Sequence, residues 1–404
     1  MSTKTIGINN VNQKSGSATV TVNVAEGTNY LAASKTVNVT TDFVKIYGVE
    51  WDGTATTTWT RTDDAVGFTD PVPAVNNGNG SSPFDNISPW KNMVKETRTG
   101  GVMVKIPKFY FKWTKSGNTM SLKIIPNEFS SYALANGYSV CPACMDRGDG
   151  KGERNYVYVG RYHCASDYKS KTGEQPNVNK AIYEFHNSIH SLGTNIWQWD
   201  YTILVTIWML YLVEYADWNS QNKIGWGGGV DDNYRTTADN TGFTDSMIYH
   251  TGTNTGTRTQ YGHVQYRNIE DLWANVDHYC DGVMFKDYAI YCFKDPSKID
   301  YLYFYNKGTN VGTAARTSSS YISSWAFSSV SGFGWFLYPD AKNGSGTTYI
   351  TDVCSNSNGN RVLTVGGNYH TYYHGDYYGL FCLSGGGSYS QGSGTTSSRI
   401  MELP

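Results

Sequence analysis

Residues 361–404 read RVLTVGGNYHTYYHGDYYGLFCLSGGGSYSQGSGTTSSRIMELP, and the interpretation of the chain starts from them. Of these 44 residues, 21 are Gly, Ser or Tyr, and only Arg361, Asp376, Arg399 and Glu402 are charged. A solvated tail would carry more charge, and a packed core segment would carry more Leu, Ile and Val. Binding loops favour Tyr, Ser, Gly and Asn, because Tyr offers a rigid surface and the others adapt their hydrogen bonds. The stretch therefore predicts a recognition surface or, alternatively, Gly-rich turns that close a domain.

The overall composition is aromatic, glycine-rich and poor in charge. The 404 residues include 43 Gly, aromatic residues make up 15%, and charged residues make up only 16%. The net charge is -2 and no basic block is present, so nucleic acid is not an expected partner. This length allows two or three domains, and the composition is typical of a strand-rich and loop-rich binding protein.

The most apolar segment is Ile203–Val213, which reads ILVTIWMLYLV. It is too short to span a bilayer, so we expect a buried helix and no membrane insertion. The first residues, MSTKTIGINN, contain no apolar run that would indicate a signal peptide. We expect a protein that folds in the bacterial cytoplasm and leaves the cell within an assembled particle.

The cysteines and acidic loops give weak metal signals. The cysteine count is odd, which favours buried free thiols over a disulfide framework, and zinc binding by Cys141, Cys144 and the His163–Cys164 pair is the alternative. Asp146, Asp149 and Glu153 leave open a structural calcium, although a solvated turn fits their spacing better. His186 and His190 lie four residues apart, but we expect core or surface histidines. No metal and no cofactor are therefore predicted. The seven cysteines are Cys141, Cys144, Cys164, Cys280, Cys292, Cys354 and Cys382.

Three regions follow from the change in pattern along the chain. In residues 1–42, valines alternate with polar residues at Val20, Val22, Val24, Val37 and Val39, which predicts half-buried strands. This region resembles an immunoglobulin-like β fragment and would serve as the attachment segment. Residues 43–176 are predicted to be β-rich, with a hairpin turn at 116–118 and a strand at Tyr156–Val159. Residues 177–404 contain the two helical stretches, 177–190 and 196–218, and a variable segment at about 354–404.

Three pieces of the last region resemble the C-type-lectin-like fold of formylglycine-generating and sulfatase-modifying proteins. They are WMLYLVEYADW at 208–218, NIEDLWANVDHYCDG at 268–282, and the tail pieces VGGNY at 365–369 and SSRIMEL at 397–403. The resemblance implies an α+β fold, in which a C-type-lectin-like domain follows a β-rich region and a short immunoglobulin-like fragment. It also implies scaffold roles for Gly366, Gly367, Cys382 and Arg399.

Residues 43–404 more closely resemble phage tail proteins with such an end. The pieces that match are IYGVEWDGT, WTRTDDAVGFTDP, SSPFDNISPW, DRGDGKGER, YVYVGRYHC, MLYLVEYADWNSQNKIG, TDSMIYHTGT and GLFCLS. In these proteins a diversity-generating retroelement often rewrites Asn-type codons into Tyr, His, Asp, Ser, Gly and Thr. Residues 368–378 and 355–360 consist of that set.

The resemblance to phage tail proteins implies a tail-tip adhesin, that is, a receptor-binding protein of a phage or prophage virion. Its expected partners are a host cell-surface protein or glycan, other tail proteins, and further copies of itself, with a trimer as the working guess. A purely structural tail or baseplate protein is the alternative. The predicted ligand-binding residues are Asn356, Asn358, Asn360, Asn368, Tyr369, His370, Tyr372, Tyr373, His374, Asp376, Tyr377, Tyr378 and Tyr389.

No enzyme activity is expected. The oxidase chemistry of the formylglycine-generating family needs a cysteine pair in the final segment to bind copper; residues 368–378 contain none, and Cys382 stands alone. A glycan depolymerase needs two carboxylates about 5 to 10 Å apart, and no motif singles out such a pair. The candidates by count are Asp231, Asp232, Asp239, Asp245, Glu270, Asp271 and Asp277.

Overall fold

The computed structural model describes residues 16–24, 33–41, 44–227, 237–256, 262–369 and 378–404. Strands make up 36% and helices 15% of the structure. No helix in the described ranges is long and apolar enough to cross a membrane. The strands form five sheets, and the α-helices are α1 (Ser130–Ala135), α2 (Ile182–His190), α3 (Tyr201–Tyr215), α4 (Ser220–Lys223) and α5 (Phe304–Lys307).

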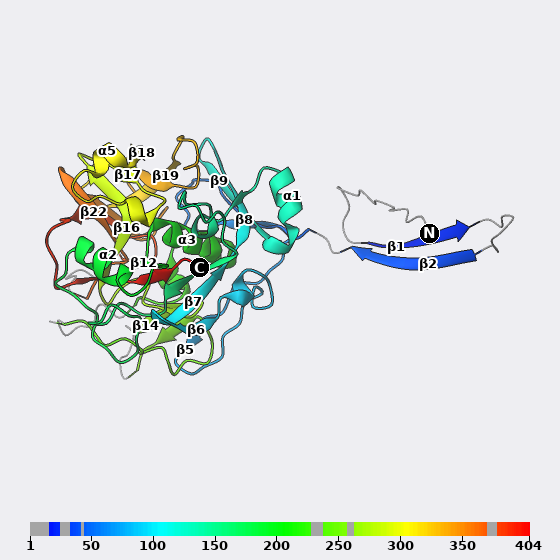
Figure 1. Ribbon diagram of the computed structural model, residues 1–404, viewed down its shortest axis with the longest axis horizontal. Coiled ribbons are helices and arrows are strands. Elements are labelled where there is room, and N and C mark those ends of the chain that lie inside the picture. The colour runs from blue at the N-terminus through cyan, green and yellow to red at the C-terminus, as the bar shows by residue number, and fades with distance from the viewer. Residues whose placement is uncertain (1–15, 25–32, 42–43, 228–236, 257–261, 370–377) are drawn as a thin grey trace.

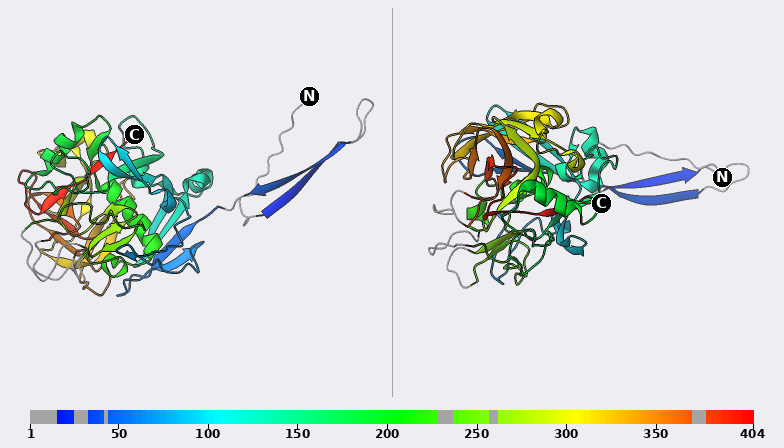
Figure 2. Two further views of the ribbon diagram at one scale, coloured as in Figure 1. Left: turned by 90° about the horizontal axis from the view of Figure 1, so that it is seen from below. Right: turned by 60° about the vertical axis from the view of Figure 1, so that its left-hand side comes forward.

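The N-terminal sheet is a hairpin of two strands, β1 (Gly16–Val24) and β2 (Ala33–Thr41). The alternation of valines predicted both strands, and they pair antiparallel with Val20 opposite Val37 and Ala18 opposite Val39. Figures 1 and 2 show the hairpin projecting away from all the other elements. A lone two-stranded hairpin is marginally stable in water.

Two five-stranded sheets make up the part of the body nearer the hairpin. The first contains the hairpin β8–β9, which turns at Gly117 with φ +60° as predicted at 116–118. The second takes in the C-terminal strand β25, which pairs with both β11 and β12. The first sheet has the order β10 (Ser139–Val140), β8 (Phe109–Ser116), β9 (Thr119–Pro126), β3 (Tyr47–Trp51) and β4 (Thr60–Asp63). The second has the order β12 (Ile196–Gln198), β25 (Ile400–Glu402), β11 (Tyr156–Gly160), β7 (Gly101–Pro107) and β6 (Lys95–Arg98).

A nine-stranded sheet curls until its two edges nearly meet. Just after its first strand, Ala315 N donates a hydrogen bond to Pro339 O in its last strand, 3.0 Å, so the sheet resembles a barrel. Apolar side chains fill its interior and leave a cavity of about 20 Å³ beside Phe285 and Leu337. The order is β18 (Thr309–Thr313), β17 (Ala289–Cys292), β16 (Asp277–Lys286), β22 (Asn360–Val365), β23 (Leu383–Gly387), β21 (Val353–Asn356), β19 (Ser320–Phe327) and β20 (Leu337–Lys342), with β24 (Thr396–Ser398) paired to β16.

The smallest sheet of the body has the order β15 (Ile269–Glu270), β14 (His263–Tyr266), β13 (Gly252–Asn254) and β5 (Ala74–Val75). Its strands are two to four residues long, and β13 pairs antiparallel with β14 but parallel with β5. The connection into this sheet, residues 237–251, contains turns but no helix or strand. Such a loop needs its own polar contacts to hold a fixed shape.

Helix α3 lies at the centre of the body (Figure 1), as the apolar run predicted. Asp200 caps its N-terminus by accepting hydrogen bonds from Thr202 N and Ile203 N, and Ala216 ends it in the left-handed region with φ 51°. Every residue of α3 is buried, which fits a helix that is apolar on all faces. The predicted stretch 196–218 was too long, because residues 196–198 form strand β12 before the cap.

The predicted α+β fold with a C-type-lectin-like domain is wrong. The structure is mostly β, and its largest unit is the nearly closed sheet rather than short sheets braced by two helices. The periodicity of the sequence indicated many strands correctly but carried no information on which strands pair. In the nine-stranded sheet several neighbours are distant in sequence, including the parallel pairs β21–β23 and β16–β24. Local pattern does not specify such pairings.

Candidate functional site

The predicted contact residues that the structure describes lie in three separate places. Asn358 and Asn360 are exposed at the turn between β21 and β22. Asn368 and Tyr369 follow the far end of β22, about 17 Å away at roughly 3.3 Å per strand residue. Tyr389 is half-buried and packs against a different apolar cluster. His370, Tyr372, Tyr373, His374, Asp376 and Tyr377 lie outside the described residues.

Asn356, another predicted contact residue, belongs to the scaffold by its contacts. It is 5% exposed, and its Oδ1 accepts a hydrogen bond from Thr317 N, 3.1 Å. Its Nδ2 donates to Ala315 O. Both ends of the amide are therefore engaged within the nine-stranded sheet, close to the point where that sheet nearly closes.

A buried carboxylate holds the chain just before residues 370–377. Asp277 Oδ2 accepts a hydrogen bond from Asn368 Nδ2, 2.5 Å, and the carboxylate also accepts one from Gly367 N. Tyr369 N donates to Asn275 O, 2.9 Å, and the Tyr369 ring packs on Ala238 and Val276. This end is fixed by hydrogen bonds that use mainly the backbone.

A second buried carboxylate, that of Asp352, holds the chain just after that segment. Its two oxygens accept hydrogen bonds from Gly379 N, 2.8 Å, and Phe381 N, 2.7 Å. Between them, Leu380 N donates to Ser220 Oγ, 2.9 Å, and Leu380 O accepts from Trp208 Nε1, 2.8 Å. Burial raises the pKa of both Asp277 and Asp352 to about 7. The returning chain is therefore also held through its backbone.

The two ends meet at a pair of glycines that had been predicted as scaffold. Gly366 and Gly367 have φ values of +87° and +73°, a region that favours glycine. A Cβ on Gly367 would lie 2.4 Å from the Cβ of Tyr378, so the outgoing and returning chains touch there. A Cβ on Gly366 would lie 2.6 Å from Leu272 O. The chain at Gly367 and the chain at Tyr378 thus lie side by side.

Arg399 connects the C-terminal stretch of the chain to the rest of the body by hydrogen bonds. Its Nη1 donates to Gly160 O, 3.1 Å, and Arg161 O, 2.8 Å. Its Nη2 donates to Asp271 O, 2.7 Å, and to Glu270 O. Burial lowers the pKa of Arg399 to about 10. This agrees with the scaffold role that the sequence predicted for Arg399, and Cys382, also predicted as scaffold, is buried as well.

The sequence did not reveal a buried ionic group around His263, next to the residues that Arg399 contacts. His263 Nδ1 lies 2.6 Å from Asp271 Oδ2, and its Nε2 lies 2.8 Å from Asp239 Oδ2. Burial alone would lower the pKa of His263, but the two carboxylates outweigh it and raise the pKa to about 10. Asp239 N in turn donates to Asn275 Oδ1, 3.0 Å. The imidazolium therefore joins residues 239 and 263 to the segment that supports Tyr369.

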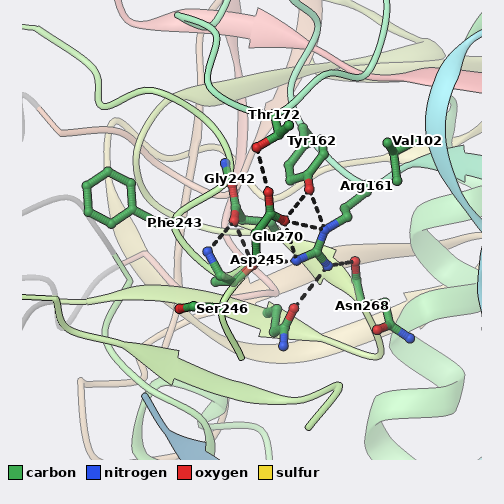
Figure 3. Close-up of polar contacts among 12 residues, drawn as sticks. Val102, Arg161, Tyr162, Thr172, Gly242, Phe243, Asp245, Ser246, Asn268 and Glu270 are labelled. Atoms are coloured by element: carbon green, nitrogen blue, oxygen red, sulfur yellow. Dashed lines mark hydrogen bonds and ion pairs between the residues drawn. The ribbon is translucent and has the colours of Figure 1, made fainter. Parts of the chain in front are cut away.

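A second network of hydrogen bonds fixes residues 237–251, the connection that contains no helix or strand (Figure 3). Asp245 accepts hydrogen bonds from Arg161 Nη2, 3.1 Å, Thr172 Oγ1, 2.5 Å, and the Tyr162 hydroxyl. Burial would raise the pKa of Asp245, but these donors outweigh it and lower the pKa. Glu270 accepts from Gly242 N, 2.7 Å, Thr244 N, 2.7 Å, and Thr244 Oγ1, 2.6 Å. Both carboxylates are occupied as acceptors that hold the loop in place.

The described carboxylates that were candidates for a glycan-cleaving pair thus make contacts that support the fold. Asp239 and Asp271 share His263, Asp245 and Glu270 hold the loop, and Asp277 holds Asn368. Asp231 and Asp232 lie outside the described residues. Each of these described carboxylates has at least one oxygen that accepts a hydrogen bond from a protein donor or lies within hydrogen-bond distance of His263.

The carboxylates of the predicted calcium loop also have separate partners. Asp146 Oδ1 accepts from Gly148 N, 2.9 Å, Asp149 Oδ1 accepts from Lys151 N, 3.1 Å, and Glu153 lies 3.7 Å from Lys108 Nζ. Within the described ranges, no group of three or more His, Cys, Asp or Glu residues is arranged to hold a metal ion. Cys141 and Cys144 belong to the main apolar cluster, whereas Cys164 belongs to another.

No protein-family model matches this chain, and no curated protein matches it.

Proposed function

We propose that this protein is the receptor-binding adhesin of a phage or prophage tail and that residues 368–378 form the main part of its contact surface. The observation that carries the proposal is the way this segment is anchored. Asp277 and Asp352 hold its two ends largely through backbone N–H groups, and the ends touch at Gly367 and Tyr378.

Anchors of this kind suit a segment whose side chains change. Hydrogen bonds to Gly379 N and Phe381 N do not depend on the side chains between the two ends. A rigid frame with loops that carry the binding residues is the usual arrangement of adaptable binding proteins. The segment itself consists of Asn, Tyr, His, Thr, Gly and Asp, the set expected from rewritten Asn-type codons. This combination supports a diversified recognition surface for a host protein or glycan.

The position of the anchors supports the same assignment. The strands that lead into the segment lie on the side of the body away from the N-terminal hairpin (Figures 1 and 2). A tail adhesin needs one end that joins the virion and another that faces the host. In this proposal the hairpin joins other tail proteins or further copies of the chain, and the opposite face contacts the host surface.

The first test replaces Tyr372, Tyr373, Tyr377 and Tyr378 with Ser. We expect binding of the purified protein to host cells to fall at least tenfold, because each buried Tyr contributes on the order of 1 to 2 kcal/mol. The melting temperature and the oligomeric state should not change. The matched control replaces the exposed tyrosines Tyr183 and Tyr303, which are 40% and 55% exposed on other elements, and should leave binding intact.

The same variants distinguish the rival structural role. In a purely structural tail or baseplate protein the Tyr-rich segment would be buried between subunits, so the four substitutions would break assembly. The DNA beside the gene gives an independent test. A near-copy of the segment's coding sequence that differs almost only at adenines, next to a reverse transcriptase gene, is the expected finding. Its absence would leave ordinary binding loops without a diversification mechanism.

A further inference from the structure

Two of the seven cysteines are placed against each other in one tight turn. Cys141 comes directly before the short 3₁₀ helix η3 (Pro142–Cys144), and Cys144 N donates to Cys141 O, 3.0 Å, which closes the turn. Both side chains are fully buried, and Cys144 Sγ donates to Ile106 O, 4.0 Å. The ends of a four-residue turn lie within about 7 Å of each other, and a disulfide spans Cα atoms about 4.4 to 6.8 Å apart.

We propose that Cys141 and Cys144 form a redox-active dithiol, which closes into a disulfide when the folded protein meets a small-molecule disulfide such as oxidised glutathione. The placement of the two cysteines at the two ends of one preformed turn carries this proposal, because closure of the disulfide then needs rotation of side chains rather than movement of the backbone. The proposal concerns a modification site and does not depend on the adhesin assignment.

The reaction has two steps, with oxidised glutathione as the oxidant. The Cys141 thiolate attacks one sulfur of the oxidant, forms a mixed disulfide and releases one glutathione thiolate. Cys144 then loses its proton and attacks the Cys141 sulfur, which expels the second glutathione thiolate. The two protein thiols are oxidised, one oxidant molecule is reduced to two thiols, and two protons pass to the glutathione thiolates or to solvent.

The surroundings of Cys141 and Cys144 indicate which thiol attacks the oxidant and which one resolves the mixed disulfide. Burial would raise the pKa of Cys141, but its interactions with Cys144 and with backbone amides outweigh burial and lower the pKa. Burial raises the pKa of Cys144 well above its ordinary value. Because the thiolate is the nucleophile, Cys141 attacks first and Cys144 resolves. Burial also raises the pKa of the other five thiols, Cys164, Cys280, Cys292, Cys354 and Cys382, which should stay reduced.

The turn connects a sheet to the central helix, so its closure has a structural consequence. Cys141 N donates to Phe109 O, 2.9 Å, at the start of β8, and Ala143 N donates to Thr206 Oγ1, 2.9 Å, on α3. A disulfide here would restrict the unfolded chain and fix this junction. We expect the oxidised protein to melt at a higher temperature. Since both thiols are buried, the reaction proceeds through local opening of the turn and speeds up in mild denaturant.

The test treats the full folded chain with oxidised glutathione, quenches it in acid, alkylates it in denaturant and maps the peptides by mass spectrometry. We expect a chain that is lighter by two hydrogen atoms, with Cys141 and Cys144 linked and the other five cysteines alkylated. A reducing agent should restore all seven thiols. Seven alkylated cysteines after treatment, a link elsewhere, or glutathione retained on the wild-type chain would each overturn the proposal.

Single substitutions then test the order of attack. C144S should accumulate glutathione on Cys141, because the resolving thiol is gone, whereas C141S should leave Cys144 as a free thiol. C354S, which removes a buried thiol outside the turn, should close the Cys141–Cys144 link as the wild type does. Glutathione on Cys144 of C141S, at the rate seen for Cys141 in C144S, would contradict the assignment of Cys141 as nucleophile.

Discussion

At the scale of single residues, Asp277 and Asp352 combine an anchoring role with an unusual protonation state. Burial raises the pKa of each from 3.8 to about 7. Each also accepts hydrogen bonds from the chain beside residues 370–377. Sequence patterns gave no sign of either role, because an Asp within a β-rich region normally indicates a turn or an exposed position. The partners come from elements distant in sequence, which only the fold brings together.

We predict that Asp352 makes the folded state more stable in mild acid. The folded carboxyl keeps a proton that the unfolded chain releases above about pH 4, so stability falls as the pH rises through about 7. The slope from this group is at most about 1.4 kcal/mol per pH unit. D352N should flatten the wild-type dependence between pH 5 and pH 7 in urea denaturation. Substitution of the exposed Asp340 by Asn serves as the control, and equal slopes in D352N and the wild type would disprove the assignment.

At the scale of elements, the sequence predicted the central helix well but did not reveal the ion pair between Glu214 on this helix and Arg267. The apolar run indicated a buried helix, and α3 is buried along its whole length. Glu214, near its end, is 0% exposed and accepts hydrogen bonds from Arg267 Nε, 3.1 Å, Ser82 Oγ, 2.7 Å, and Tyr266 Oη, 3.0 Å. Its position directly after the apolar run was the available signal, since a buried Glu requires a cationic partner. The identity of that partner could not be predicted, because Arg267 lies more than fifty residues further along the chain.

We predict that E214L destabilises the protein by about 3 to 5 kcal/mol, because it removes the fully buried carboxylate partner of the Arg267 guanidinium and leaves only the partly exposed Asp85, 3.1 Å away. The double variant E214L/R267M should regain most of that loss, since replacing both partners removes the unpaired charge. Chemical denaturation of the wild type, both single variants and the double variant gives the coupling free energy. Additive losses in the double variant would mean that the two side chains do not form an energetically coupled pair.

At the scale of the whole molecule, strands were predictable and architecture was not. The alternating valines gave the N-terminal hairpin, and Tyr156–Val159 gave most of β11. The nearly closed sheet depends on contacts such as the hydrogen bond from Ala315 N to Pro339 O, which no local sequence pattern predicts. The resemblance of tail pieces to a C-type-lectin-like end led to the wrong class for this reason. The predicted contact segment, in contrast, followed from composition alone and remains a prediction for experiment.

The separation of the hairpin from the rest of the body leads to a prediction about the whole chain. In the described residues, β1 and β2 form hydrogen-bonded ladders only with each other. A chain that lacks residues 1–42 should therefore keep the melting temperature of the full chain and its binding to host cells as an isolated molecule. It should fail to join other tail proteins or further copies of itself, because the attachment element is missing. Calorimetry, cell binding and light scattering measure the three properties.

The truncated chain and the four-Tyr variant should then show opposite defects. The truncation loses assembly and keeps host binding, whereas the substitution of Tyr372, Tyr373, Tyr377 and Tyr378 keeps assembly and loses host binding. This pattern requires two functions that are carried by two separate parts of the chain. If the truncation instead lowered the melting temperature, the hairpin would be part of the body's fold. If both variants lost assembly, the Tyr-rich segment would be an interface between subunits, and the adhesin proposal would fail.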